Sequence, residues 1–298
     1  MRMSDREKNS VVLALGYFDC VHLGHKEVIL KAKLLSKQLN CKTVVFTFDG
    51  NLRAVISKDK QSFVFSSKER EKLIYSLGVD EVYFAPANKE FLSLSKREFL
   101  NVLNEKYNVR GYVSGSDYRF GKNAEGNVEF LTEYAKGKNQ TVITVNDVFC
   151  EDIKVSTTKV KEFISKGDIK SVNKLLGFSY FLTGKVVHDR AVGRTLGYPT
   201  ANVEVVKDKQ RLKFGVYKGR VLIDNKEYLS LINYGTRPTF NDDNVVIEAH
   251  LLGYSGDLYD RQITILFDDF IREIKTFSSK EELINQLEKD IKKVEKND

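Results

Sequence analysis

The sequence predicts an α/β domain built on a parallel sheet, followed by a mostly-β domain that ends in a helix. Strand-like and helix-like segments alternate in the first half, which is the pattern of a Rossmann-like parallel sheet. From about Tyr180 onward, short β-patterned runs separated by turn signals replace this alternation. A length of 298 residues suits two domains of ordinary size, which we expect at residues 1–180 and 181–298.

Apolar periodicity and capping residues predict the elements of the first half. Ser67 and Ser95 are expected to cap helices that run to Leu77 and Tyr107. The other expected helices are Glu27–Leu39, Asn127–Tyr134, Thr158–Ser165 and Ile169–Leu176. The expected strands are Val11–Leu15, Thr43–Phe48, Glu81–Phe84, Gly111–Ser114 and Thr141–Val145. Phosphate ligands of such a sheet bind at the carboxyl ends of its strands.

The second half contains five β-patterned runs and one long helix, which Ser278 or Ser279 is expected to cap. The five runs are Tyr180–His188, Val216–Ile223, Glu227–Ile232, Val245–Leu252 and Gln262–Phe267.

Composition narrows the class of protein. No apolar run approaches the roughly 20 residues of a membrane helix, and the N-terminus lacks the apolar core of a signal peptide. Three cysteines, an odd number without paired or zinc-binding spacing, favour reduced thiols in a cytoplasmic protein. The net charge of +7 comes from lysines spread along the chain, so we expect no nucleic-acid partner; a mild positive field also suits polyphosphate substrates.

The stretch Gly16–His25 (GYFDCVHLGH) lies where an apolar strand turns into a helix. A helix start offers backbone N–H groups and a favourable dipole to an anion. Gly24 permits close approach of a ligand, and His22 and His25 can donate hydrogen bonds to phosphate oxygens. The alternative is that the two histidines only cap and pack the helix start. Such fixed donors stabilise the charge that develops on an α-phosphate under attack.

This stretch resembles the opening motif of the prokaryotic bifunctional riboflavin kinase/FAD synthetases, whose histidine-x-glycine-histidine signature places them in a nucleotidyltransferase superfamily. The resemblance runs from about Val11 to Asp290 and implies a nucleotidyltransferase domain followed by a flavokinase barrel. It implies nucleotide binding by Gly16, Phe18, Asp19, Gly24, Ser156, Thr157, Thr158 and Lys161, and FMN binding by Asp117. The helix start at Ser156–Thr158 has a plain capping role as its alternative.

The chain departs from the family pattern at four positions. Cys20 replaces a glycine and would be strained if that position required φ > 0. Lys161 replaces an arginine, and a point charge is not equivalent to a planar guanidinium. A proline-histidine-proline run is missing at Phe48–Leu52, and Asp189 stands where the family prefers glycine, in a loop implied to lie over ATP.

The second half carries the stretch Gly193–Asn202 (GRTLGYPTAN), which is similar to the flavokinase signature. Oxygen ligands on Thr200 and Asn202 suit a hard cation. The resemblance implies that these two residues hold Mg²⁺ and the ATP phosphates, with Gly193, Arg194 and Gly197 beside the nucleotide and Arg237 beside the flavin. It also implies that Glu248, in an otherwise apolar strand, is the catalytic base, with His250 on the same face of that strand.

The sequence thus predicts an enzyme that phosphorylates riboflavin with ATP and then joins FMN to AMP, with Mg²⁺ as cofactor and riboflavin, FMN and ATP as substrates. The alternatives are retention of one activity only, with the kinase the more secure, a different small-molecule nucleotidyltransferase, and a non-catalytic flavin-binding regulator. The sequence leaves the oligomeric state open.

Overall fold

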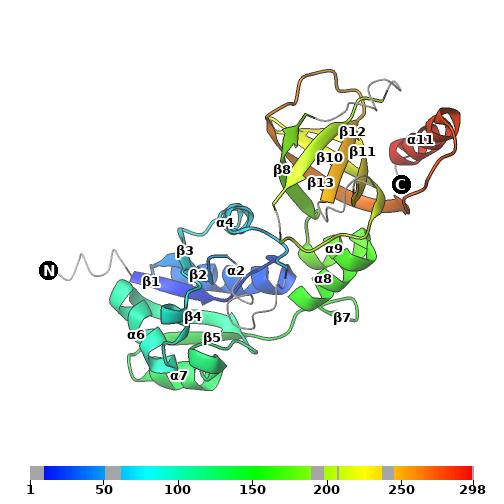
Figure 1. Ribbon diagram of the computed structural model, residues 1–298. Coiled ribbons are helices and arrows are strands. Elements are labelled where there is room, and N and C mark those ends of the chain that lie inside the picture. The colour runs from blue at the N-terminus through cyan, green and yellow to red at the C-terminus, as the bar shows by residue number, and fades with distance from the viewer. Residues whose placement is uncertain (1–9, 51–61, 189–197, 207, 237–244, 297–298) are drawn as a thin grey trace. The chain divides into compact units, whose positions relative to one another are not determined.

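The computed structural model describes residues 10–50, 62–188, 198–206, 208–236 and 245–296 (Figure 1). Contacts within the chain divide it into two compact units, Met1–Lys159 and Val160–Asp298. Compared with the boundary expected near residue 180, this division assigns most of the helix Thr157–Lys166 and all of the helix Ile169–Leu176 to the second unit. Whether residues 1–180 fold as a domain stays a prediction.

A five-stranded parallel sheet forms the centre of the first unit, in the order β3-β2-β1-β4-β5. Its strands are β1 (Ser10–Leu15), β2 (Lys42–Phe48), β3 (Glu81–Ala85), β4 (Asn108–Gly115) and β5 (Thr141–Val145). The chain runs outward from β1 to β3 on one side and returns to β4 on the other side. The ends of β1 and β4 therefore flank the switch point at which open α/β sheets bind ligands.

Helices cover both faces of this sheet (Figure 1). Val12 and Ala14 of β1 pack with α2 (Leu23–Gln38) and with Ile74 of α4 (Ser67–Ser76). The alternate residues of β1 face α6 (Lys96–Lys106) and α7 (Val128–Lys136). Burial on both faces explains why β1 is a continuous apolar run. Shorter elements complete the unit: α5 (Lys89–Leu92), the 3₁₀ turn η1 (Lys122–Ala124) and the hairpin of β6 (Phe149–Cys150) and β7 (Ile153–Lys154).

The second unit contains a closed barrel in the order β10-β11-β12-β9-β8-β13. It begins with α8 (Thr157–Lys166) and α9 (Ile169–Leu176), and α9 contacts β13 through a hydrogen bond from Asn173 to the Phe267 carbonyl. The strands are β8 (Phe181–Val187), β9 (Ala201–Val205), β10 (Gly215–Ile223), β11 (Lys226–Thr236), β12 (Val245–Leu251) and β13 (Gln262–Arg272). The fold class predicted from the sequence is confirmed in both halves.

The C-terminal helix α11 (Lys280–Glu295) covers one side of the barrel (Figure 1). Its Leu287, Ile291 and Val294 pack against Val216 of β10 and Leu231 of β11. Beside this contact, Asp290 is fully buried and accepts hydrogen bonds from Arg272 and Gln286 at 2.8 Å. A buried ion pair therefore supplements the apolar contact between α11 and the barrel.

Several expected boundaries are wrong, for local reasons. Helix α2 begins at Leu23 instead of Glu27, because the His22 side chain caps it. Ser66, not Ser67, caps α4, because Glu69 lies three residues after Ser66 and completes a capping box. Strand β9 and helix α5 were not expected at all. At the C-terminal helix, Ser279 is the cap.

We predict that Asp290→Ala lowers the free energy of unfolding by about 3–5 kcal/mol, because it leaves the Arg272 charge buried without its carboxylate. Urea unfolding followed by circular dichroism measures the change. Glu288→Ala, an exposed site on the same helix, is the matched control and should shift the unfolding curve little. Equal effects of the two substitutions would contradict a structural role for the ion pair.

Candidate active sites

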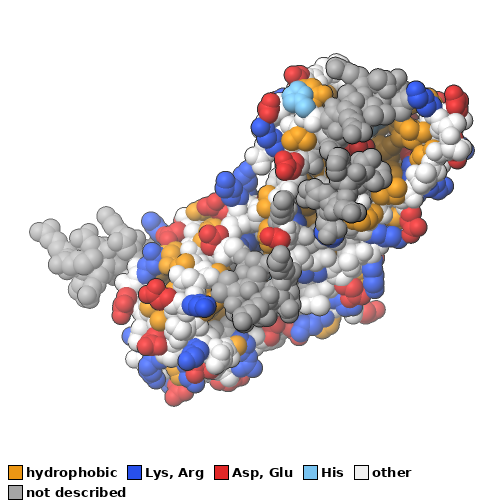
Figure 2. Space-filling view, viewed as in Figure 1, with side chains coloured by type: hydrophobic (Ala, Val, Ile, Leu, Met, Phe, Trp, Pro, Cys, Tyr) orange, Lys and Arg blue, Asp and Glu red, His pale blue; other side chains and the backbone are white. Residues whose placement is uncertain are grey.

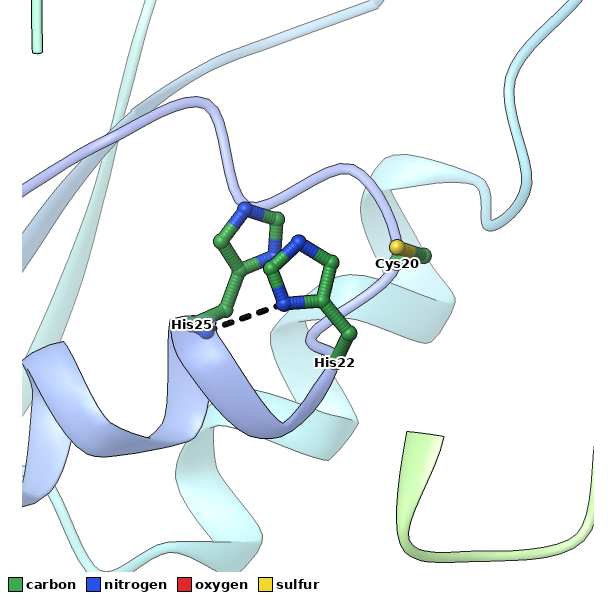
Figure 3. A group of neighbouring side chains, drawn as sticks. All are labelled: Cys20, His22 and His25. Atoms are coloured by element: carbon green, nitrogen blue, oxygen red, sulfur yellow. Dashed lines mark hydrogen bonds between the residues drawn. The ribbon is translucent and has the colours of Figure 1, made fainter. Parts of the chain in front are cut away.

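A pair of stacked histidines lies at the start of α2, directly after the loop that follows β1 (Figure 3). The two ring centroids are 3.6 Å apart and the rings are inclined by 15°. His22 Nδ1 accepts a hydrogen bond from the backbone N–H of His25 at 3.1 Å, so this ring caps the helix. The structure therefore brings His22 and His25 together and gives His22 the capping role that was the structural alternative, while a role of either ring in catalysis stays a prediction.

Both imidazoles are neutral near pH 7. Burial lowers the pKa of His22 to about 4. Burial also lowers the pKa of His25, and the nearby His22 and Arg70 lower it further. Since His22 Nδ1 accepts the cap hydrogen bond, its neutral ring carries the proton on Nε2 and can donate it to an anion there. In the free protein, this pair therefore offers a phosphate hydrogen bonds from neutral rings and not a fixed positive charge.

The loop before the histidines has a constrained backbone. Phe18 and Val21 adopt φ values of +49° and +48°, in the left-handed region that β-branched residues avoid. Cys20 does not have a positive φ, so the backbone strain that its replacement of glycine suggested is not found there; it falls on Val21 instead. Gly16 is required for another reason, because a Cβ atom at this position would lie 2.7 Å from the Phe18 ring.

Asp19 and Gly24 support the loop and the helix start. Asp19 is buried, and its Oδ1 accepts a hydrogen bond from the backbone N–H of Val64 at 3.1 Å. A Cβ atom on Gly24 would lie 3.2 Å from the His22 ring, which makes this glycine a condition for the stacked histidines. These contacts explain both residues structurally, and a direct role of either in nucleotide binding stays a prediction.

Arg70 on α4 is an important residue of this region that the sequence analysis missed. Its side chain is only 1% exposed. Its guanidinium donates to the carbonyls of Tyr17 at 3.0 Å and Phe48 at 2.8 Å, and to the hydroxyls of Thr47 and Ser67 at 3.2 Å. The signal in the sequence was an arginine four residues before Ile74, on the apolar face of α4.

Two further sequence motifs lie at the carboxyl edge of the same sheet. Asp117 is exposed and follows the end of β4. Ser156 Oγ accepts a hydrogen bond from the backbone N–H of Lys159, so Ser156 caps α8, and its role in nucleotide binding stays a prediction. The Thr157 hydroxyl is 3.6 Å from the thiol of Cys20, which places the start of α8 beside the loop after β1. Thr158 is exposed and Lys161 half-buried on α8.

The segment that lacks the family's proline-histidine-proline run is described only as far as Gly50, and Asp49 and Gly50 form a bend. Asp49 Oδ1 accepts hydrogen bonds from the backbone N–H of Gly50 at 2.8 Å and from the Ser67 hydroxyl at 2.6 Å. Gly50 has φ +66°. Asn51 and Leu52 lie outside the described residues, as do Asp189, Gly193, Arg194, Gly197 and Arg237 of the second half.

In the barrel, antiparallel pairing places Asn202 of β9 directly opposite Glu248 of β12. Paired residues of antiparallel strands have Cβ atoms about 4.5–5.5 Å apart, so the two side chains lie on the same face. Asn202 is buried, and its Oδ1 has no hydrogen-bond partner among the described residues. Glu248 is half-buried beside it. Two residues from distant motifs are therefore brought together, with an amide oxygen left available for a cation or a ligand.

His250 fixes the chain just before β9. Its Nδ1 lies 2.8 Å from the Pro199 carbonyl, and its ring packs edge-on against Tyr198. Thr200 follows and lines a cavity of about 770 Å³ together with apolar and aromatic side chains, among them Leu251, Tyr254 and Tyr259. This volume and lining are typical of a site for a small molecule such as a nucleotide.

Figure 2 shows basic and acidic side chains interspersed over the visible face of each unit. In the segments that the structure describes, no helix has the length and apolarity that crossing a membrane requires. The three cysteines, which are all described, form no disulfide.

A parallel sheet with anion donors at its switch point defines a nucleotide-binding α/β domain, and the barrel adds a cavity beside oxygen ligands. Comparison with known families agrees with both assignments. The FAD synthetase family model matches residues 4–159 and the riboflavin kinase family model matches residues 176–297.

The names of curated relatives include both activities. A bifunctional riboflavin kinase/FMN adenylyltransferase from Listeria monocytogenes is 34% identical over 94% of this chain and 90% of its own length. The protein of that name from Bacillus subtilis is 32% identical over 95% of this chain and 91% of its own length. The chain belongs to the family of bifunctional riboflavin kinase/FMN adenylyltransferases.

A solved structure has the same fold over the whole chain. It is described as a macrolide-efflux protein from Streptococcus pneumoniae, is 30% identical, and superimposes with a TM-score of 0.90 over 98% of this chain and 95% of its own. The fold of this chain therefore has an experimental counterpart in both units, under a name that differs from those of the curated relatives.

We predict that His22 makes the protein less stable in acid. An unfolded histidine binds a proton below about pH 6.5 and folded His22 only below about pH 4, so unfolding takes up a proton between these values. The free energy of unfolding should fall by about 3 kcal/mol as the pH drops through this window and then level off, since each pKa unit corresponds to about 1.4 kcal/mol.

The matched variant is His22→Asn, because asparagine caps a helix but does not titrate. Urea unfolding of both proteins from pH 7 to pH 4 isolates the histidine contribution as a difference between two curves. Parallel pH dependences would show that folded His22 titrates normally.

Proposed function

We propose that the chain makes FAD from riboflavin in two ATP-dependent steps, one in each unit. Riboflavin and ATP give FMN and ADP at the barrel, and FMN and a second ATP give FAD and pyrophosphate at the parallel sheet. The observation that carries the proposal is the presence of two separate sites, the His22–His25 pair and the Asn202–Glu248 pair, in domains of the matching families.

In the kinase step, Glu248 orients the terminal hydroxyl of riboflavin and accepts its proton as the oxygen attacks the γ-phosphorus of ATP. The pairing supports this role, because the carboxylate lies on one face with Asn202, two residues after Thr200; neither Glu248 nor Asn202 lines the Thr200 cavity itself. His250 acts indirectly, by holding the Pro199 carbonyl and so the segment that presents Thr200.

Magnesium fits the residues of the barrel. The Asn202 Oδ1 atom is buried without a hydrogen-bond partner among the described residues. Thr200, two residues earlier in the sequence, and Glu248, the residue paired with Asn202 on β12, add oxygen atoms that can bind a cation. Oxygen donors of this kind suit a hard cation. Mg²⁺ held there with ATP would neutralise part of the phosphate charge, while the side chains of this chain set its position.

In the adenylyl step, a phosphate oxygen of FMN attacks the α-phosphorus of ATP, and pyrophosphate leaves. The acceptor is itself an anion, so no nucleophilic side chain is required. His22 and His25 donate hydrogen bonds to the oxygens that gain charge, and the N-terminus of α2 adds its dipole. Asp117 and the start of α8, at the same edge of the sheet, bind the FMN side and the nucleotide.

We predict that His25→Ala lowers the rate of FAD formation from FMN by about 10²–10³-fold, the usual loss when one transition-state donor is removed. FMN formation from riboflavin should stay unchanged and provides the control within the same protein. Separation of flavins by chromatography, with riboflavin or FMN as the starting flavin, measures both rates. Loss of both activities would indicate misfolding, and retention of FAD formation would remove His25 from the mechanism.

Glu248→Gln should show the opposite selectivity. Removing the carboxylate should slow FMN formation by about 10²–10⁴-fold, while added FMN is still converted to FAD. Glu204→Gln is the matched control, because Glu204 is an exposed carboxylate on the neighbouring strand β9. If the two glutamine variants phosphorylate riboflavin equally well, Glu248 is not the base.

A further inference from the structure

A thiol and two imidazoles meet at the start of α2 (Figure 3). One ligand atom from each of Cys20, His22 and His25 lies within 4.8 Å of the other two. The spacing of the three cysteines gave no sign of a metal site, because two of the ligands are histidines contributed by the phosphate-binding motif itself. Only the substitution of cysteine for the family's glycine completes the set.

We propose that Cys20, His22 and His25 form a binding site for a borderline-soft divalent metal ion such as Zn²⁺. One sulfur and two imidazole nitrogens are preferred ligands of Zn²⁺ and Co²⁺, and they are poor ligands for Mg²⁺. The barrel, by contrast, offers oxygen donors. The two candidate cation sites of the chain therefore differ in ligand chemistry.

The geometry is close to what such an ion requires. Metal–nitrogen distances of about 2.0–2.1 Å and metal–sulfur distances of about 2.3 Å hold tetrahedral ligand pairs roughly 3.3–3.8 Å apart. The three ligand atoms, now up to 4.8 Å apart, must approach one another by about 1–1.5 Å, and the two stacked rings must turn so that both nitrogen lone pairs point at one ion. A small displacement of the Cys20 thiol, which lies 3.6 Å from the Thr157 hydroxyl, would supply part of this movement.

A second observation supports the site independently of the cysteine. His25 Nδ1 is buried and has no hydrogen-bond partner among the residues described. A buried polar atom without a partner is costly, and an ion that binds at Nδ1 would relieve that cost. The orphaned atom belongs to one of the three residues that converge on the site.

Metal binding has a defined proton balance. The Cys20 thiol binds as a thiolate and releases its proton to solvent. His22 gives up its cap: the ion either takes Nδ1 in place of the His25 N–H, or takes Nε2 after the ring proton has moved to Nδ1. No oxidation or reduction occurs. Three protein ligands leave a fourth position for water.

The consequence for activity rests on the proposed function. The same two imidazoles are the donors proposed for the ATP phosphates, so a ring engaged by the metal cannot donate in the same way. Zn²⁺ should therefore inhibit FAD formation and spare FMN formation. ATP and the metal should also compete for the site.

The test of the site itself uses Co²⁺, whose thiolate complexes absorb light, and requires no activity. Full-length protein, reduced and treated with a chelator, is titrated with Co²⁺ alone. We expect one equivalent with a thiolate-to-cobalt band. Cys20→Ser should lose the band and bind more than about 100-fold more weakly, since even indirect metal contacts are worth 10–100-fold. Cys41→Ser and Cys150→Ser, which retain the site, are the controls.

Two outcomes would overturn the site: no stoichiometric binding by the wild-type protein, or an unchanged band in Cys20→Ser. A second assay then follows FAD and FMN formation with increasing Zn²⁺, with each variant compared with its own metal-free rate. Inhibition of FAD formation that disappears in Cys20→Ser supports the competition, and equal inhibition of both variants refutes it. Absence of FAD formation without added Zn²⁺ would refute the proposed function, while the cobalt titration would still decide the metal site.

Discussion

The buried guanidinium of Arg70 is the interaction on which the carboxyl edge of the N-terminal sheet depends. It joins the loop after β1, the end of β2 and the start of α4 by donating to Tyr17, Thr47, Phe48 and Ser67. The planar guanidinium has several N–H donors and can bond acceptors that lie in different directions. A buried lysine ammonium could not reach the same acceptors with the same geometry. Because Tyr17 belongs to the loop that leads to the histidines, Arg70 also determines where that loop starts.

Arg70 links the architecture of this edge to its electrostatics. Burial is the main reason that the pKa of His25 lies below its usual range, and the nearby His22 and Arg70 lower it further. The edge therefore contains one permanent buried cation and two neutral rings. A polyphosphate would enter a positive field supplied by arginine and by the helix dipole, and would find its specific donors on the imidazoles. A buried and a half-buried histidine could therefore donate to a phosphate without being charged beforehand.

In the barrel, strand pairing brings the candidate site residues together. Asn202 and Glu248 come from motifs 46 positions apart, and the β9–β12 register makes them neighbours. Alternation along β12 directs Ile247, Ala249 and Leu251 to one side and leaves Glu248 and His250 on the other. The Glu248 carboxylate is thus kept out of the apolar core, because alternate residues of the strand point to opposite sides.

The sequence predicted the order of the elements well, because buried strands and amphipathic helices have distinct apolar periods. The prediction failed where the contacts of a single side chain, and not the apolar period, decide the local structure. His22 starts α2 four residues early by capping it, and a histidine is not among the usual caps. Arg70 was missed, because its hydrogen-bond acceptors come from distant segments that only the folded chain brings around it. Strand β9 was missed because Pro199 and Thr200 read as a turn, whereas its pairing with β8 and β12 is a long-range property.

Cys20 shows how a local departure can change chemistry without changing the fold. The glycine usual at this position suggested a backbone requirement, yet the positive φ values fall on its neighbours Phe18 and Val21. A side chain is therefore tolerated at position 20, and the thiol is buried without backbone strain. What the substitution alters is the set of ligands around the phosphate donors. A loop with N–H donors suited to a hard anion thereby acquires a soft ligand as well.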